Sequence, residues 1–142
     1  MRLAYGAGWM LDDATPLDAS AFESVQKAWN DLSKPDAEKT SGDLIAELKF
    51  SFWVSLLAQK YDETLWRRAC YKAFPNFKGR RAVVHSRFNV IRRFRNRIAH
   101  HEPIFHKDLR RVHSEVIQAT GWMCRDTQTW SAQLSEFNRM LS

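Results

Sequence analysis

The chain has 142 residues, 44% of them hydrophobic, and this length and composition suit one packed globular domain and exclude a disordered chain. No apolar run approaches the roughly 18 residues that a membrane span needs, and the first residues lack a signal-peptide pattern, so we expect a cytoplasmic protein without membrane contact. The two cysteines have no CxxC spacing, which leaves a disulfide framework or a zinc ribbon without support.

The charge of the chain is unevenly distributed. The net charge is +6, but Lys78–Arg111 alone holds eleven basic and two acidic residues, a local +9 that leaves −3 for the rest. A basic block on a mildly acidic domain indicates a polyanionic partner, of which RNA or DNA is the commonest. The alternative is a solvated helix face that binds nothing.

The first half of the chain predicts an irregular arm and two helices. Residues 1–17 show no sustained period. A capping box formed by Ser20 and Glu23 opens an apolar pattern at helical spacing, which predicts a helix that ends near Ser33. After a polar loop, a broad apolar face predicts a second helix over residues 43–58.

The second half continues with helical patterns, and no segment alternates over a length typical of a strand. We therefore expect an all-α bundle of about five to six helices, with residues 18–142 forming a single domain. The longest helix is basic and is predicted to stop at Glu102-Pro103, because proline excludes the helical conformation for the residue before it. The predicted ranges are 62–74, 81–100, 107–123 and 126–141.

The end of the basic helix combines residue types that RNA cleavage needs. Asn96 and His100 lie four apart and share a face, whereas Arg95 lies about 140° around the axis from His100, on the apolar stripe. The Arg95 guanidinium must then reach around the helix, pair with a buried carboxylate or cross an interface. Histidine transfers protons near neutral pH, and the planar fork of arginine matches phosphate oxygens. We predict His100 for proton transfer or leaving-group stabilisation, Arg95 for phosphate charge and Asn96 for orientation.

Further candidates surround these three. Glu47 interrupts the apolar pattern of the second helix, where an unpaired carboxylate would be costly, so either an arginine of the basic helix pairs with it or it is exposed at the edge of the stripe. His101 is equally consistent with simple capping of the negative helix end. The supporting candidates are Arg97, His101, Glu102 and Glu47, and the RNA-binding candidates are Arg80, Arg81, Arg87, Arg92 and Arg93.

The histidines near the helix end do not predict a metalloprotease. The spacing from His101 and Glu102 to His106 is one residue longer than HExxH, and a proline interrupts it. The sequence also lacks a glycine-rich phosphate loop, so we expect neither a metal nor another cofactor.

Arg95 and His100 match the Arg-x4-6-His signature of HEPN ribonucleases, and FRNRIAHHEPIF (residues 94–105) resembles the Abi-like, abortive-infection branch of that superfamily. Residues 42–76 also resemble its pattern of an acidic, aromatic-rich helix followed by Leu-Trp and Phe-Pro. The resemblance covers residues 42–112, about half of the chain. It implies a HEPN-like fold and a metal-independent endoribonuclease that leaves 2′,3′-cyclic phosphate ends. It also implies a toxin or abortive-infection effector in phage defence.

The resemblance implies partners as well. HEPN ribonucleases pair two motifs across a two-fold interface, so a homodimer is expected, and an antitoxin, protein or RNA, is among the partners that such an effector can have. One alternative is a catalytically silent HEPN-like module that binds RNA or a partner protein. Another is a helix-turn-helix DNA binder, although FPNFKGRRA (residues 74–82) lacks a tight turn between two short helices.

Overall fold

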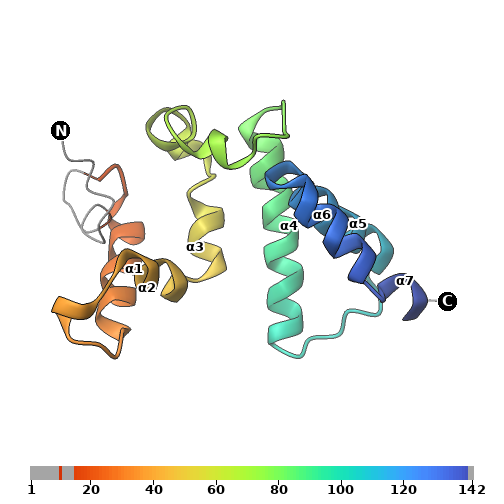
Figure 1. Cartoon of the computed structure of the whole chain (residues 1–142), viewed down its shortest axis with the longest axis horizontal. Helices are drawn as coiled ribbons and strands as arrows, with labels where there is room; N and C mark the ends of the chain where they lie inside the picture. The colour runs from red at the N-terminus through yellow and green to blue at the C-terminus, as the bar shows by residue number, and fades with distance from the viewer. Residues whose placement is uncertain (1–9, 11–14, 141–142) are drawn as a thin grey trace. The chain divides into compact units, whose positions relative to one another are not determined.

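The computed structural model describes Met10 and residues 15–140. All regular structure in these residues is helical and they contain no strand, so the predicted all-α class is confirmed (Figure 1). None of the helices in this part of the chain is long and apolar enough to cross a membrane. The predicted irregular arm over residues 1–17 falls mostly outside the described residues.

The chain divides into two compact units, and each is described by itself. The N-terminal unit comprises Met1–Ser55 and the C-terminal unit Leu56–Ser142. The single domain predicted for residues 18–142 therefore stays a prediction.

The N-terminal unit is built from α1 (Ala19–Asp31), a single 3-10 turn, α2 (Ser41–Glu47) and α3 (Phe50–Ser55). α1 packs against α2. The helices bury one apolar stripe each, as amphipathic helices of a small core do. The buried side chains are Ala21, Val25, Ala28, Leu44, Leu48, Phe52 and Val54.

The starts of α1 and α2 are capped by side chains. The predicted capping box at Ser20 is wrong, because the carboxylate of Asp18 accepts the hydrogen bond from the backbone N–H three residues on, at 3.0 Å. A capping box occurs instead at α2, where Thr40 and Asp43 each accept from the other's backbone N–H. Hydrogen bonds from Lys34 and then from Thr40 hold the pKa of Asp43 at about 2.

The second predicted helix is interrupted. Residues 43–58 form α2 and α3, and Leu48 between them has an extended backbone with φ −65° and ψ 126°. The aromatic and β-branched residues of Phe50–Val54 have low helix propensity, so local preference does not hold one long helix through this point. Burial of Leu48 in the core accompanies the break.

The C-terminal unit is organised around α4 (Arg81–Ala99). α4 packs against α5 (Leu109–Met123), which packs against α6 (Arg125–Leu134) (Figure 1). α5 and α6 approach closely at Gly121, where an added Cβ would collide with the side-chain amide of Gln128.

The segment before α4 is not the regular helix predicted over residues 62–74. The N–H of Arg67 donates to the carbonyl of Asp62 at 2.9 Å, a π-helical turn. Tertiary contacts override the helical pattern here, since the Phe74 ring lies 5.8 Å from that of Trp66 and 5.6 Å from that of Phe88 on α4. The observed elements are 3-10 turns at Gln59–Tyr61 (η3) and Cys70–Ala73 (η5) and the π-helical segment Asp62–Trp66 (η4).

The last predicted helix, over residues 126–141, breaks at Ser135 into α6 and α7 (Phe137–Met140). The Ser135 hydroxyl lies 2.8 Å from Nε2 of His113 on α5 and accepts from the N–H of Phe137 at 3.4 Å. A serine side chain that bonds locally competes with the helical backbone, which explains the break.

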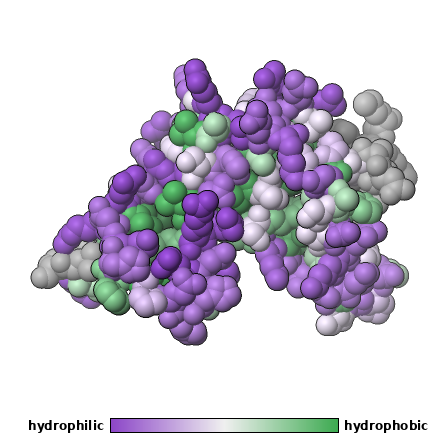
Figure 2. All heavy atoms as spheres, turned by 180° about the vertical axis from the view of Figure 1, so that it is seen from behind, coloured by the Kyte–Doolittle hydropathy of each residue, from purple (hydrophilic) through white to green (hydrophobic). Residues whose placement is uncertain are grey.

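Apolar side chains also reach the surface. Trp130 and Leu134 lie one turn apart on α6 and are 62% and 61% exposed. Figure 2 shows hydrophilic side chains over most of the face in view, with apolar side chains between them. Exposed aromatic and aliphatic groups on one helix face are typical of contact surfaces.

Candidate functional site

The basic helix α4 ends in a Schellman motif. The helix stops at Ala99, the N–H of His101 donates to the carbonyl of Ile98 at 3.1 Å, and the N–H of Glu102 donates to the carbonyl of Arg97 at 2.8 Å. These two bonds satisfy carbonyls that a helix end leaves open. The proline stop predicted from the sequence lies beyond this motif and is therefore not what ends the helix.

His101 holds the strained position of this motif. Its φ of 55° is the only positive φ of a non-glycine residue in the described part of the chain. The left-handed region costs a residue with a Cβ about 1–2 kcal/mol, and histidine is among the residues found there more often. Such strain is common at functional sites. The turn leaves the imidazoles of His100 and His101 exposed.

A side-chain hydrogen bond and a backbone hydrogen bond connect the three predicted catalytic residues at the end of α4. Nη1 of Arg95 donates to Oδ1 of the adjacent Asn96 at 3.4 Å. No acidic side chain among the described residues is buried, so a reach around the helix and a contact across an interface both stay predictions. The backbone carbonyl of Asn96 accepts from the N–H of His100 at 2.9 Å. The His100 side chain has no hydrogen-bond partner within the described residues. The exposed His100 imidazole and the contact between Arg95 and Asn96 thus belong to the same end of α4.

Two of the supporting residues, Arg97 and Glu102, form an ion pair across the turn. Nη1 of Arg97 lies 3.6 Å from Oε2 of Glu102 and donates to the carbonyl of Pro103 at 3.4 Å. An exposed ion pair of this kind contributes about 0–1 kcal/mol, so its effect is to position more than to stabilise. Glu47 is exposed at the end of α2 in the N-terminal unit, and its role stays a prediction.

A polar row that sequence reasoning missed runs along α4. Asn89 connects Nε2 of His85, at 2.8 Å, to Nε of Arg92, at 3.2 Å. Burial lowers the pKa of His85, and the charges of Arg81 and Arg92 lower it further. The spacing of four residues between His85 and Asn89 was the available sequence signal.

The predicted RNA-binding arginines differ in whether their guanidinium groups already contact other side chains of the protein. Arg87 contacts α5, where it donates to the side chain of Gln118 and lies 5.2 Å from the ring of Trp122. Arg80 and Arg93 are exposed, and the described residues offer neither a partner. Arg80 and Arg93 are therefore the best placed to bind an anion.

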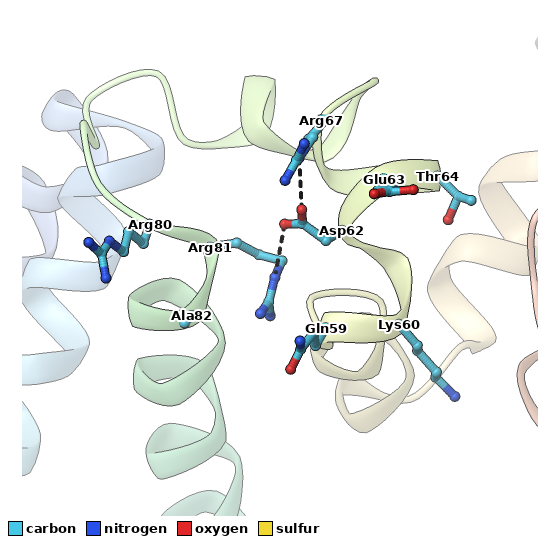
Figure 3. Close-up of a pocket in the computed structure, with 9 residues that line it drawn as sticks. All are labelled: Gln59, Lys60, Asp62, Glu63, Thr64, Arg67, Arg80, Arg81 and Ala82. Atoms are coloured by element: carbon cyan, nitrogen blue, oxygen red, sulfur yellow. Dashed lines mark hydrogen bonds and ion pairs between the residues drawn. The ribbon is translucent and has the colours of Figure 1, made fainter.

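A second polar site lies at the start of α4, in a pocket of about 540 Å³ (Figure 3). Asp62 is at its centre: one carboxylate oxygen lies 2.8 Å from Nε of Arg67, the other 3.2 Å from Nε of Arg81. Arg81 also donates to the carbonyl of Leu57, and its side chain is only 11% exposed. Arg80 points away from Asp62 (Figure 3). Although Arg81 was predicted to bind RNA, its guanidinium is committed to contacts inside the protein.

No group of three or more His, Cys, Asp or Glu side chains within the described residues is arranged to hold a metal ion. No family model matches the chain, and no curated protein or solved structure is detectably similar to it. The HEPN resemblance and the roles of the site residues therefore stay predictions.

We predict that His101→Gly stabilises the protein by about 1 kcal/mol, because glycine adopts a left-handed backbone without the steric penalty of a Cβ. Urea unfolding at neutral pH measures the change. His100→Ala is the matched control, and its effect should stay within about 0.5 kcal/mol because the side chain is exposed. A less stable His101→Gly variant would show that the His101 imidazole stabilises the turn.

We predict that Asp62→Asn destabilises the protein by about 2 kcal/mol, because it leaves the mostly buried Arg81 guanidinium without its counter-charge. Glu63→Gln is the control: Glu63 is the next residue, lines the same pocket and is exposed, so its effect should stay within about 0.5 kcal/mol. Equal stability of the two variants would mean that the Asp62 pair is not what holds this segment.

Proposed function

We propose that the protein is a metal-independent endoribonuclease of the HEPN type. The observation that carries the proposal is the group of Arg95, Asn96 and His100 at the end of a long basic helix, of which Arg95 and His100 are exposed. Exposure matters because an RNA backbone must reach the imidazole directly. Arg93 and Arg97 lie on the same part of α4 and add positive charge beside it.

The chemistry follows from these residue types. A base removes the proton of the ribose 2′-hydroxyl, the 2′-oxygen attacks the adjacent phosphorus, and the bond from phosphorus to the 5′-oxygen breaks. The 5′-oxygen takes up a proton from an acid, which leaves a 2′,3′-cyclic phosphate and a 5′-hydroxyl. His100 serves one of the two proton transfers, and Arg95 stabilises the negative charge on the phosphorane oxygens.

The distribution of charge supports RNA as the substrate. Leu56–Ser142 carries 17 basic and 7 acidic residues, a net +10, whereas Met1–Ser55 carries −4. Cationic groups that neutralise phosphates release counterions, and this supplies most of the affinity for RNA irrespective of its sequence. From the resemblance alone, we further propose a cytoplasmic toxin or abortive-infection effector that an antitoxin restrains.

We propose that two copies form the active unit. Each chain offers one Arg95–His100 pair, whereas the reaction needs proton transfer on both sides of the phosphate. Two positively charged copies repel each other, so their contact needs apolar surface with little charge. The exposed Trp130 and Leu134 on α6 are the candidates, because Thr127–Leu134 contains no charged residue.

We predict that the wild-type protein cleaves RNA in EDTA and that His100→Ala lowers the rate by about 10²–10⁴-fold, the usual contribution of a general acid or base. The assay follows a 5′-labelled oligoribonucleotide and identifies cyclic-phosphate ends. His106→Ala is the matched control, since His106 is also exposed but lies outside the Arg95–His100 pair, and it should retain full activity. Cleavage that needs Mg²⁺, or that His100→Ala leaves intact, would refute the assignment. RNA binding without cleavage would identify a silent module.

We predict that excess His100→Ala protein, mixed with wild type and left to exchange subunits, lowers the activity below that of simple dilution. In a composite site, a mixed dimer has only one intact His100. Trp130→Ala should shift the protein toward monomer in sedimentation analysis and reduce activity in parallel. A monomer with full activity at assay concentration contradicts the composite site but not the role of His100.

A further inference from the structure

An aromatic cleft of about 740 Å³ lies in the segment before α4, between η4, η5 and the loop at residues 75–79. We propose that this cleft binds one nucleotide unit, with the base stacked on aromatic rings and the phosphate held by cationic side chains. Its partly exposed aromatic residues are Trp66, Tyr71 and Phe77, and the buried Phe74 also lines it. The cationic residues are Arg67, Lys72 and Lys78.

The rings provide the surface for a base. Tyr71 is 47% exposed, and Trp66 and Phe77 are half-buried, so each presents part of its ring to the cleft. A single exposed tyrosine is ordinary, but three rings around one cleft are the arrangement on which nucleobases stack. The ligand must therefore have a flat, aromatic part.

The charges require that the ligand is also an anion. Arg67, Lys72 and Lys78 line the cleft, and no acidic residue does. The ammonium groups of Lys72 and Lys78 have no partner in the described residues, and Arg67 uses Nε for Asp62, which leaves its terminal nitrogens for a phosphate. An apolar ligand would leave the charges of Lys72 and Lys78 without a partner. A nucleotide combines both required parts.

The loop at residues 75–79 is held in place by hydrogen bonds before any ligand binds. The N–H of Asn76 donates to the carbonyl of Trp122 at 3.1 Å, its side-chain amide donates to the carbonyl of Gly121 at 3.0 Å, and Arg125 donates to its side-chain oxygen at 3.3 Å. These bonds tie the loop to the end of α5. A fixed loop reduces the entropy that a ligand loses on binding.

The position of the Phe77 ring is equally determined. The ring packs at 4.5 Å from the ring of Trp122 and lies over Gly79, where a Cβ would collide with it. Glycine at this position is what allows the ring to take its place in the cleft wall.

The cleft is separate from the proposed cleavage site. It lies at the first turn of α4, whereas His100 follows the last, and 19 helical residues span roughly 28 Å. The nucleotide is either part of an RNA strand that continues toward His100 or a free nucleotide. The chemistry is the same for both sources, and the proposal does not depend on ribonuclease activity.

Calorimetric titration of the full chain tests the proposal in a His100→Ala background, which removes cleavage of the probe. The probes are adenosine 5′-monophosphate, adenosine, ribose 5-phosphate and a pentaadenylate. The variants are Tyr71→Ala, Tyr71→Phe and the pair Lys72→Ala with Lys78→Ala. The controls are Phe105→Ala, an exposed ring elsewhere, and Lys107→Ala, an exposed lysine elsewhere.

We expect the nucleotide to bind at least ten-fold more tightly than adenosine or ribose 5-phosphate. Tyr71→Ala and the lysine pair should each weaken binding about ten-fold or more, while Tyr71→Phe and both controls bind like the parent. If only the pentaadenylate binds, with the same dependence on Tyr71 and the lysines, the nucleotide belongs to an RNA strand. The proposal is overturned if no probe binds, or if Tyr71→Ala and the lysine pair bind like the parent. Thermal unfolding of each variant verifies that the chain remains folded.

Discussion

The guanidinium of Arg81 is the contact on which the C-terminal unit depends. It fills the space between the Asp62 carboxylate and the carbonyl of Leu57, and so joins the first residue of α4 to the segment before it. A mostly buried cation needs this compensation, because an unpaired charge inside a protein is strongly unfavourable. Arg81 faces inward for this reason, while Arg80, one residue earlier, has no partner in the described residues and is exposed.

α4 carries apolar side chains on one side and polar side chains on the opposite side. Val84 and Phe88 are buried, and Phe88 packs edge-on against Phe74. The opposite side bears Arg93, Asn96 and His100, which an amphipathic helix of this length presents to solvent. The apolar contacts therefore determine which polar groups are available to a ligand, although they include none of these groups themselves.

The two ends of α4 are finished differently, and each end suits the function proposed for it. The C-terminal end closes in a Schellman motif that accepts strain at His101 and leaves His100 exposed as the cap. The N-terminal end has no side-chain cap, and the backbone carbonyl of Arg80 accepts from the N–H of Val83 at 3.0 Å. The residues that line the proposed nucleotide cleft, from Trp66 to Gly79, precede this end of the helix in the chain.

The sequence alone determined the helical class, the range of α4 to within one residue and the basic block. The helical period, the net charge and the signals at helix ends depend only on residues that are close together in the chain, so they can be recognised in the sequence. The spacing of Asn96 and His100 was likewise evident, because residues four apart share a face of any helix.

Only the tertiary structure decided which side chains of the basic block are used in contacts within the protein and which are available to a ligand. The pairing of Asp62 with Arg81, the break at Ser135 opposite His113 and the packing of Phe77 against Trp122 join residues from 19 to 45 positions apart in sequence. No local pattern encodes such contacts, because they form only when packed elements bring the side chains together. Of the three arrangements open to Arg95 from the sequence, the pairing with a buried carboxylate is absent, because every described acidic side chain is at least partly exposed.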